Sequence, residues 1–269
     1  MKYLSPLNPM YTMGRFNQTT SSLAIALCSL LTIGVFSPPG FANPNASVSS
    51  LRQGLPGRRI SGGSRSPETA CLRTPDQPVI ALMPKSNLGL TLSARPTFWF
   101  SMPDVSADRA VEFGLYDAEG EMLYQKTFSP GAAGITDFSL PEDAPTLATG
   151  QDYRWYLSVV CDRASRSEDL VVTGWVRRIE ADSTLQAQLA TASPEEQVAL
   201  YESQALWYDA LTTLAKLQQT NPTSALRQQW TALFESIDLP QITETPFSPS
   251  LAPYLAALPE PTSDPGPSL

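Results

Sequence analysis

The 269-residue chain contains no histidine. Without an imidazole it has no Ser–His or Cys–His catalytic pair, it lacks the usual zinc ligands, and it cannot use histidine as a pH switch. Basic residues are also few, because 18 Lys and Arg stand against 26 Asp and Glu. An acidic chain is repelled by a phosphate backbone, which argues against a nucleic-acid partner. We therefore expect no nucleic acid, no metal, no cofactor and no histidine-dependent catalysis.

Long apolar runs are scarce as well. The run at residues 22–36 is shorter than the roughly 20 residues that a membrane-spanning helix needs. Charged residues precede it, and small residues stand at the −3 and −1 positions of a cut after Ala42. This order is typical of a secretory signal peptide over residues 1–42, and we predict cleavage between Ala42 and Asn43. An uncleaved anchor is the alternative. We expect no membrane span in the mature chain.

Cysteine is rare, with three in the whole chain and one of them inside the predicted signal peptide. Cys71 and Cys161 remain after cleavage. An even pair in an oxidising compartment predicts a disulfide between them, whereas two thiolates alone make a metal site much less favoured. Export leaves three locations open, namely the periplasm, the thylakoid lumen and the cell surface.

Two segments have a composition that argues against a packed core. Residues 43–70 are rich in Ser, Gly, Pro and Arg and show almost no apolar periodicity. They form either a flexible basic arm or an arm that docks on an acidic partner or on the acidic remainder of this chain. Residues 240–269 are rich in proline, and we predict a disordered tail there.

Residues 71–180 carry the pattern of short strands separated by turns. Val111, Phe113 and Leu115 alternate with smaller or polar residues, the period-2 pattern of a half-buried strand. Such patterns predict strands at residues 79–82, 88–92, 97–101, 111–115, 122–128, 135–140, 153–161 and 170–179. Because no helical spacer separates them, we predict an antiparallel β-sandwich domain and, with the helices that follow, an α+β fold.

A local motif sharpens this expectation. Leu147, Gly150, Tyr153 and Trp155 have the spacing of the tyrosine corner of immunoglobulin-like and fibronectin-like sandwiches, where a Tyr hydroxyl bonds back to the preceding loop. Every second residue from Tyr153 to Cys161 is apolar, so this strand face must point inward. We predict that Trp155 is a core residue rather than a ligand platform.

After residue 180 the apolar period becomes helical. Asp182 or Ser183 can cap a short helix, and Ser193 with Glu196 forms a capping box that has proline at the first helical position. Two further helices are indicated by apolar residues at helical spacing within residues 207–217 and 226–237.

These helices match only part of a tetratricopeptide repeat, through Tyr201, Ala210, Leu214 and Pro222. A solenoid needs about three repeats to bury a core. We therefore predict a small tetratricopeptide-like helical unit over residues 181–239 that leans on the sandwich or on a partner.

Seven short stretches stand out together. They are Pro56-Gly57-Arg58-Arg59, Asn87-Leu88-Gly89-Leu90-Thr91, Pro96-Thr97-Phe98-Trp99-Phe100, Tyr153-Arg154-Trp155-Tyr156, Cys161-Asp162, Gly174-Trp175-Val176 and Leu206-Trp207-Tyr208-Asp209-Ala210. In combination they resemble the cyanobacterial family called domain of unknown function 928, over about residues 54–240. The resemblance implies an exported, signal-bearing protein without an established activity, and it supplies no catalytic residues.

We therefore predict an exported, non-enzymatic binding or scaffold protein with a protein partner. One alternative is an envelope hydrolase that uses surface acids, and the other is a structural envelope component without a discrete ligand. A groove with two converging carboxylates would favour the hydrolase, and a seamless surface with docked helices would favour the structural component. The acid pairs available are Glu119/Glu121, Glu142/Asp143, Glu168/Asp169 and Glu195/Glu196.

Overall fold

The computed structural model describes residues 55–62, 71–73 and 77–251. The predicted signal peptide, with its cleavage site at Ala42 and Asn43, lies outside the described residues. The strands are β1 Ile80–Ala81, β2 Leu88–Thr91, β3 Thr97–Met102, β4 Ala110–Tyr116, β5 Met122–Phe128, β6 Gly134–Ser139, β7 Asp152–Val160 and β8 Leu170–Arg178. The helices are α2 Ser183–Thr191, α3 Pro194–Ser203, α4 Trp207–Thr220 and α5 Ser224–Ser236, with short 3-10 turns η1 Arg166–Glu168 and η2 Pro240–Glu244.

The strands form two sheets, one in the order β1-β3-β6 and one in the order β2-β8-β7-β4-β5. Their facing sides bury a common core, in which Phe98 contacts Phe113 and Trp155 with ring centroids 5.1 and 5.4 Å apart. The period-2 pattern explains this core, because alternate residues of β4 and β7 point into it. Trp155 is 1% exposed, so its prediction as a core residue is confirmed.

Most neighbouring strands are antiparallel, but β2 is not. It pairs parallel with β8, from Leu88 opposite Trp175 to Thr91 opposite Arg178. The prediction of a purely antiparallel sandwich is therefore wrong at this edge. The reason is topological, because β2 and β8 are distant in the sequence and no hairpin sets their relative direction.

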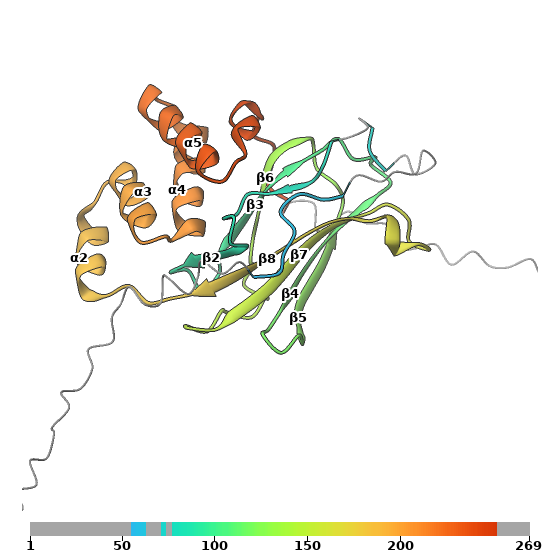
Figure 1. Ribbon diagram of the computed structural model, residues 1–269, viewed down its shortest axis with the longest axis horizontal. Helices are drawn as coiled ribbons and strands as arrows, with labels where there is room; N and C mark the ends of the chain where they lie inside the picture. The colour runs from blue at the N-terminus through green and yellow to red at the C-terminus, as the bar shows by residue number, and fades with distance from the viewer. Residues whose placement is uncertain (1–54, 63–70, 74–76, 252–269) are drawn as a thin grey trace, which may run out of the picture. The chain divides into compact units, whose positions relative to one another are not determined.

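The three-stranded sheet is covered on both faces. Its second face carries Ile80, Leu82, Trp99 and Ile135, and these side chains form a separate core with α4 and α5. Figure 1 shows α2–α5 gathered at one end of the sheets, beside β2. The helical unit is expected to pack on the sandwich or on a partner, and the structure shows contact with the sheets.

The predicted helix caps are present. Asp182 accepts from the Leu185 N–H, and Ser193 and Glu196 form the reciprocal capping box at the start of α3. The helix that begins there ends at Ser203, and Ala205 just beyond it adopts a left-handed conformation with φ 56°, which is common after a helix end.

Part of the arm at residues 43–70 is described by the structure, namely residues 55–62, which we call the strap. This part is not a flexible linker. Within residues 55–62, the backbone of Arg58 pairs with Thr173 of β8 and Ile60 pairs with Ile80 of β1. Main-chain hydrogen bonds hold this strap, so docking on the same chain is the alternative that the structure supports. Composition alone cannot reveal such pairing, because the strap contributes backbone rather than an apolar stripe.

The prediction of a disordered tail from residue 240 onward is also wrong in its first part. The turn η2 contacts α5, and residues 246–251 run along β6. There Ile135 donates to Pro246 O at 2.7 Å and Leu251 donates to Asp137 O at 2.9 Å. Ile242 and Leu251 are fully buried. The prolines do not prevent this contact, because a proline carbonyl still accepts hydrogen bonds along a sheet edge. Residues 252–269 lie outside the described residues.

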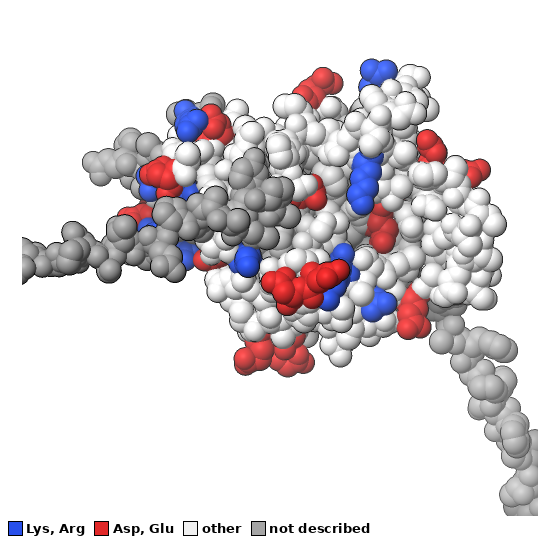
Figure 2. All heavy atoms as spheres, turned by 180° about the vertical axis from the view of Figure 1, so that it is seen from behind, with Lys and Arg blue, Asp and Glu red and all other residues white. Residues whose placement is uncertain are grey.

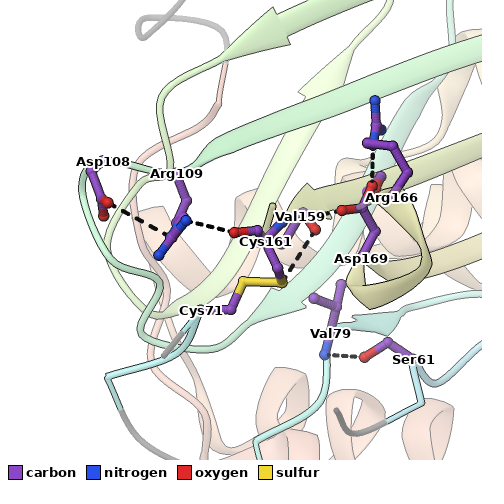
Figure 3. The surroundings of a disulfide bond; sticks show 10 residues. Ser61, Cys71, Val79, Asp108, Arg109, Val159, Cys161, Arg166 and Asp169 are labelled. Carbon is purple, nitrogen blue, oxygen red and sulfur yellow. Dashed lines mark hydrogen bonds and ion pairs between the residues drawn. A yellow bond between two sulfur atoms is a disulfide. The ribbon is translucent and has the colours of Figure 1, made fainter. Parts of the chain in front are cut away.

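Cys71 and Cys161 form a disulfide with their Cα atoms 5.0 Å apart, within the range that a disulfide requires, and both are buried (Figure 3). The Cys71 carbonyl accepts from Ser106, and the Cys161 N–H donates to Asp169 at 3.1 Å. The bond therefore links the short segment at residues 71–73 to the end of β7.

No helix among the described residues is long and apolar enough to cross a membrane. The face of the molecule in Figure 2 carries scattered acidic and basic side chains among a majority of other residues, with no continuous field of one sign.

Candidate functional site

An apolar groove of about 690 Å³ opens where the helices meet the edge of the five-stranded sheet. Its walls come from the β1–β2 loop, from β2, from the α3–α4 junction and from α5. The lining residues are Pro84, Lys85, Ser86, Leu88, Leu90, Glu202, Ala205, Leu206, Trp207, Ala210, Ala232, Leu233 and Ser236. A mostly apolar cavity of this size with a few polar groups is typical of a binding site.

The alternation of residues along β2 builds one wall. Leu88 and Leu90 line the groove, while Gly89 between them faces the ring of Tyr208. A β-carbon at Gly89 would lie 2.5 Å from Cε2 of that ring, so only glycine lets α4 approach the strand so closely.

The first turn of α4 is fixed deep between the sheets through Tyr208. Its hydroxyl accepts from Trp155 Nε1 at 2.9 Å and donates to Trp175 O at 3.1 Å. Complete burial raises the pKa of the Tyr208 phenol above its ordinary value, so it remains a neutral donor. The neighbouring Trp207 donates to Leu82 O at 2.9 Å, which holds its indole at the groove wall.

Asp209 ties the same helix to the end of β2. Its carboxylate accepts from the Leu92 N–H at 3.1 Å and from Thr91. Burial raises the pKa of Asp209, although both hydrogen bonds act in the opposite direction. This carboxylate therefore positions the strand and the helix that form the groove.

The rim of the groove is polar. Lys85 forms an ion pair with Asp238 at 2.6 Å, and Glu202 lies on the α3 side, where burial raises the pKa of its carboxyl group. Arg59 of the strap donates to Ile237 O at 2.9 Å, and burial lowers the pKa of its guanidinium. The strap thus holds the chain segment that carries Asp238.

Backbone strain surrounds the groove. Among the described residues, the non-glycine residues with positive φ are Asn87 at 60°, Ala205 at 56° and Asp238 at 59°. Ala205 lines the groove, Asn87 lies between two lining residues, and Asp238 pairs with Lys85. Such conformations cost about 1–3 kcal/mol each and concentrate at ligand-binding sites, where the surrounding structure enforces them.

The residues singled out from the sequence lie elsewhere. Cys71 and Cys161 do not line the groove, and neither does any of the four acid pairs. Among those pairs, Asp169 is turned inward with its side chain 3% exposed, whereas Glu196 serves the α3 cap. Within the described residues, no cluster of three or more His, Cys, Asp or Glu side chains could hold a metal ion.

Sequence reasoning missed the groove itself. Two stretches that carry the family resemblance, residues 87–91 and 206–210, meet at this wall through Gly89 and Tyr208. The one usable signal is the amphipathic stripe of residues 207–217, which identified the helix that forms the wall. The strand that receives it was visible only as a separate short apolar run.

Comparison with known proteins identifies the family. The model of the family described as Domain of Unknown Function (DUF928) matches residues 60–247. The chain belongs to this family. No curated protein matches the chain. The DUF928 match includes the strap from Ile60 onward, both sheets, all described helices and the segment up to Phe247.

Proposed function

We propose that this DUF928 protein is an exported, non-enzymatic binding module that holds an apolar segment of a protein partner in its groove. The observation that carries the proposal is the groove of about 690 Å³, whose mostly apolar lining comes from β2, the α3–α4 junction and α5. Burial of apolar side chains drives protein association, and exposed apolar concavities mark partner sites.

The fixed geometry of the walls supports the same proposal. Tyr208 and Asp209 join α4 to the sheet by buried hydrogen bonds, so the groove does not have to form when the partner arrives. A preformed site spares the entropy of ordering its own walls, which improves affinity for a given contact area.

The hydrolase alternative has less support. Outside the groove, Arg166 bonds two carboxylates, Glu112 at 3.2 Å and Asp169 at 2.6 Å. One guanidinium thus occupies both carboxylates, whereas a glycosidase needs one of the two to be available to the glycosidic oxygen as a proton donor. The other alternative, a structural envelope component without a discrete ligand, would predict a surface without a cavity at the position of the groove.

Three finer assignments belong to the proposal. The Tyr153 hydroxyl accepts from the Ala148 N–H at 2.9 Å, which supports an immunoglobulin- or fibronectin-like β-sandwich with a tyrosine corner. The α3–α4 pair supports a tetratricopeptide-like helical unit. Export through a signal peptide cut after Ala42 is supported by the buried Cys71–Cys161 disulfide, because such bonds persist in oxidising compartments.

The groove can be tested by photo-cross-linking in the native envelope. A benzoylphenylalanine at the exposed position 203, next to the lining residue Glu202, should form a discrete adduct with one protein. Ala232→Trp places a large ring in the groove and should abolish that adduct. Gln219→Trp adds the same ring at an exposed position of α4 outside the groove and serves as the matched control.

The expected result is an adduct in the parent chain and in the Gln219→Trp variant, and none in the Ala232→Trp variant. Equal thermal unfolding of both variants would show that they are folded. An adduct of equal yield in the Ala232→Trp variant, or no adduct in the parent chain, would contradict the groove as the partner site.

A further inference from the structure

A second cavity lies on the opposite side of the core from the helices, on the outer face of the five-stranded sheet. It is shallow, about 410 Å³, and its lining includes Glu112, Tyr116, Arg154, Tyr156, Arg166 and Asp169. Alternate residues of β4 and β7 point into the core, so the residues between them face outward at this cavity. The proposed partner groove shares none of these residues.

Aromatic rings form part of its floor. Gly114 lies opposite Tyr156 in the β4–β7 register, and a β-carbon at Gly114 would collide with the ring of Tyr156. The glycine therefore allows this ring to lie across the sheet instead of standing away from it. The ring of Tyr116 follows with its centroid 5.9 Å from that of Tyr156 and its plane inclined by 38°. Both rings are only partly buried.

The polar groups around the rings are held in place by one another. The Tyr156 hydroxyl donates to Glu112 at 2.7 Å and accepts from Gln125 at 3.0 Å. Arg166 bonds Glu112 and Asp169, and Asp169 also accepts from Ser158 at 3.1 Å. These donors and acceptors are thus oriented before any ligand arrives.

Arg154 completes the floor. Its guanidinium lies 4.8 Å from the centroid of the Tyr116 ring, a cation–π contact that leaves the edge of the planar group available to donate hydrogen bonds. Arg154 and Arg166 are both exposed, but Arg166 is bound by two carboxylates.

The charges of the cavity cancel, because Arg154 and Arg166 stand against Glu112 and Asp169. A strongly anionic ligand would meet two carboxylates, and a cationic one would meet two guanidinium groups. The complementary ligand is therefore uncharged, with an apolar face for the rings and many hydroxyl groups for the fixed polar side chains. A pyranose ring has both properties.

We propose that this cavity binds the neutral sugar units of a glycan chain, with Tyr116 and Tyr156 stacking against the sugar rings. Arg154, Arg166, Glu112 and Gln125 hydrogen-bond the sugar hydroxyl groups. This site is independent of the partner groove, so the protein would join a protein segment at one end to a glycan on its sheet face.

The test uses the mature full-length chain and isothermal titration with named probes. These are neutral hexasaccharides built from glucose, mannose or xylose, the corresponding free monosaccharides, and polygalacturonate as an anionic glycan. We expect saturable binding of at least one neutral hexasaccharide and much weaker binding of its monosaccharide, because the paired rings contact a chain rather than one unit. Polygalacturonate should not bind.

Three variants make the proposal falsifiable. Tyr116→Ala should weaken the binding of the hexasaccharide about tenfold through loss of one stacking ring. Arg154→Ala should weaken it as well, and Tyr156→Phe should weaken it less because the ring remains. Leu123→Ala, at an exposed position of β5 outside the cavity, is the control and should change nothing.

Circular dichroism and thermal unfolding would establish that each variant is folded. Failure of all neutral hexasaccharides to bind at millimolar concentration would overturn the proposal. Equal affinity of the parent chain and the folded Tyr116→Ala variant would overturn it too, as would binding of polygalacturonate alone.

Discussion

At the scale of single residues, the groove depends on buried polar side chains that join α4 to the sheets by hydrogen bonds. Tyr208 and Asp209 are neighbours on α4, yet they bond to β7, β8 and the end of β2. Each hydrogen bond satisfies a group that is expensive to leave buried without a partner. This arrangement leads to two predictions about stability.

Tyr208→Phe should destabilise the protein by about 1–3 kcal/mol, because it leaves the buried Trp155 N–H without an acceptor and the Trp175 carbonyl without this donor. The ring and its packing remain, so the variant should still fold. Chemical denaturation would give the free energy of unfolding. Tyr116→Phe, at a partly buried ring on the outer sheet face, is the matched control and should lose much less.

Asp209→Asn should change how stability depends on pH. Burial raises the pKa of Asp209 in the folded state, so the folded protein binds its proton more tightly than the unfolded chain does. Protonation of Asp209 therefore contributes its whole stabilising free energy below the pKa of the unfolded state, which is about 3.9. This contribution is lost as the pH rises through the raised pKa of the folded state.

The free energy of unfolding of the parent chain, minus that of Asp209→Asn, should therefore fall as the pH rises from about 3 through this window. Denaturation curves at a series of pH values measure the difference. Asp137→Asn should behave in the same direction, because burial also raises the pKa of Asp137. A difference that rises with pH would show that hydrogen bonding, rather than burial, dominates at Asp209.

At the scale of elements, the sequence predicted the strands and helices well because each carries its own periodic pattern. The predicted strand at residues 122–128 matches β5, and the capping box marks the start of α3. Pairing across the chain was harder. Neither the parallel β2–β8 pair nor the docking of the strap at Arg58 has a local signal, because both depend on backbone groups that every residue has.

The proline-rich composition of residues 240–251 predicts disorder, but this segment is packed in the structure. Ile242 and Leu251 are fully buried, and each large apolar side chain contributes about 1.5–3 kcal/mol when buried. A chain from residue 43 to 239 should therefore lose several kcal/mol of unfolding free energy relative to one from residue 43 to 251. Equal thermal midpoints of the two chains would show that this segment adds nothing to the fold.

At the scale of the whole molecule, the helices and the two sheets share their cores. Trp99 of β3 donates to Thr212 of α4 at 3.0 Å, and its indole is buried in the cluster that α4 and α5 complete. A fragment of residues 181–239 would expose this cluster. It should be poorly folded or self-associated, whereas the chain from residue 43 to 251 should unfold in one cooperative transition. A cooperative melt of the isolated, monomeric fragment would contradict this account.

The disulfide also acts on the whole molecule. It closes a loop of 90 residues between Cys71 and Cys161, and the chain-entropy account assigns about 4–5 kcal/mol to a loop of this size. Replacement of both cysteines by alanine should lower the free energy of unfolding by a large part of that amount. Non-reducing peptide mapping of the protein should find the two cysteines joined. Two free thiols would contradict the structure at this position.

The candidate site was beyond sequence reasoning for the same reason as the parallel strand pair. Leu88, Leu206 and Leu233 come from segments far apart in the chain, and each one alone is indistinguishable from an ordinary core leucine. The concavity exists only once α4 has been fixed against Gly89. Family membership was visible from the sequence, because it depends on short local stretches.

The central claim is that the groove holds an apolar segment of a partner. Its most direct test is to map, by mass spectrometry, the partner residue that becomes cross-linked to position 203. We predict that this residue lies within or next to a segment with several apolar side chains, and that alanine substitutions there abolish the adduct. A cross-link to a purely polar segment, or one that survives those substitutions, would contradict the account.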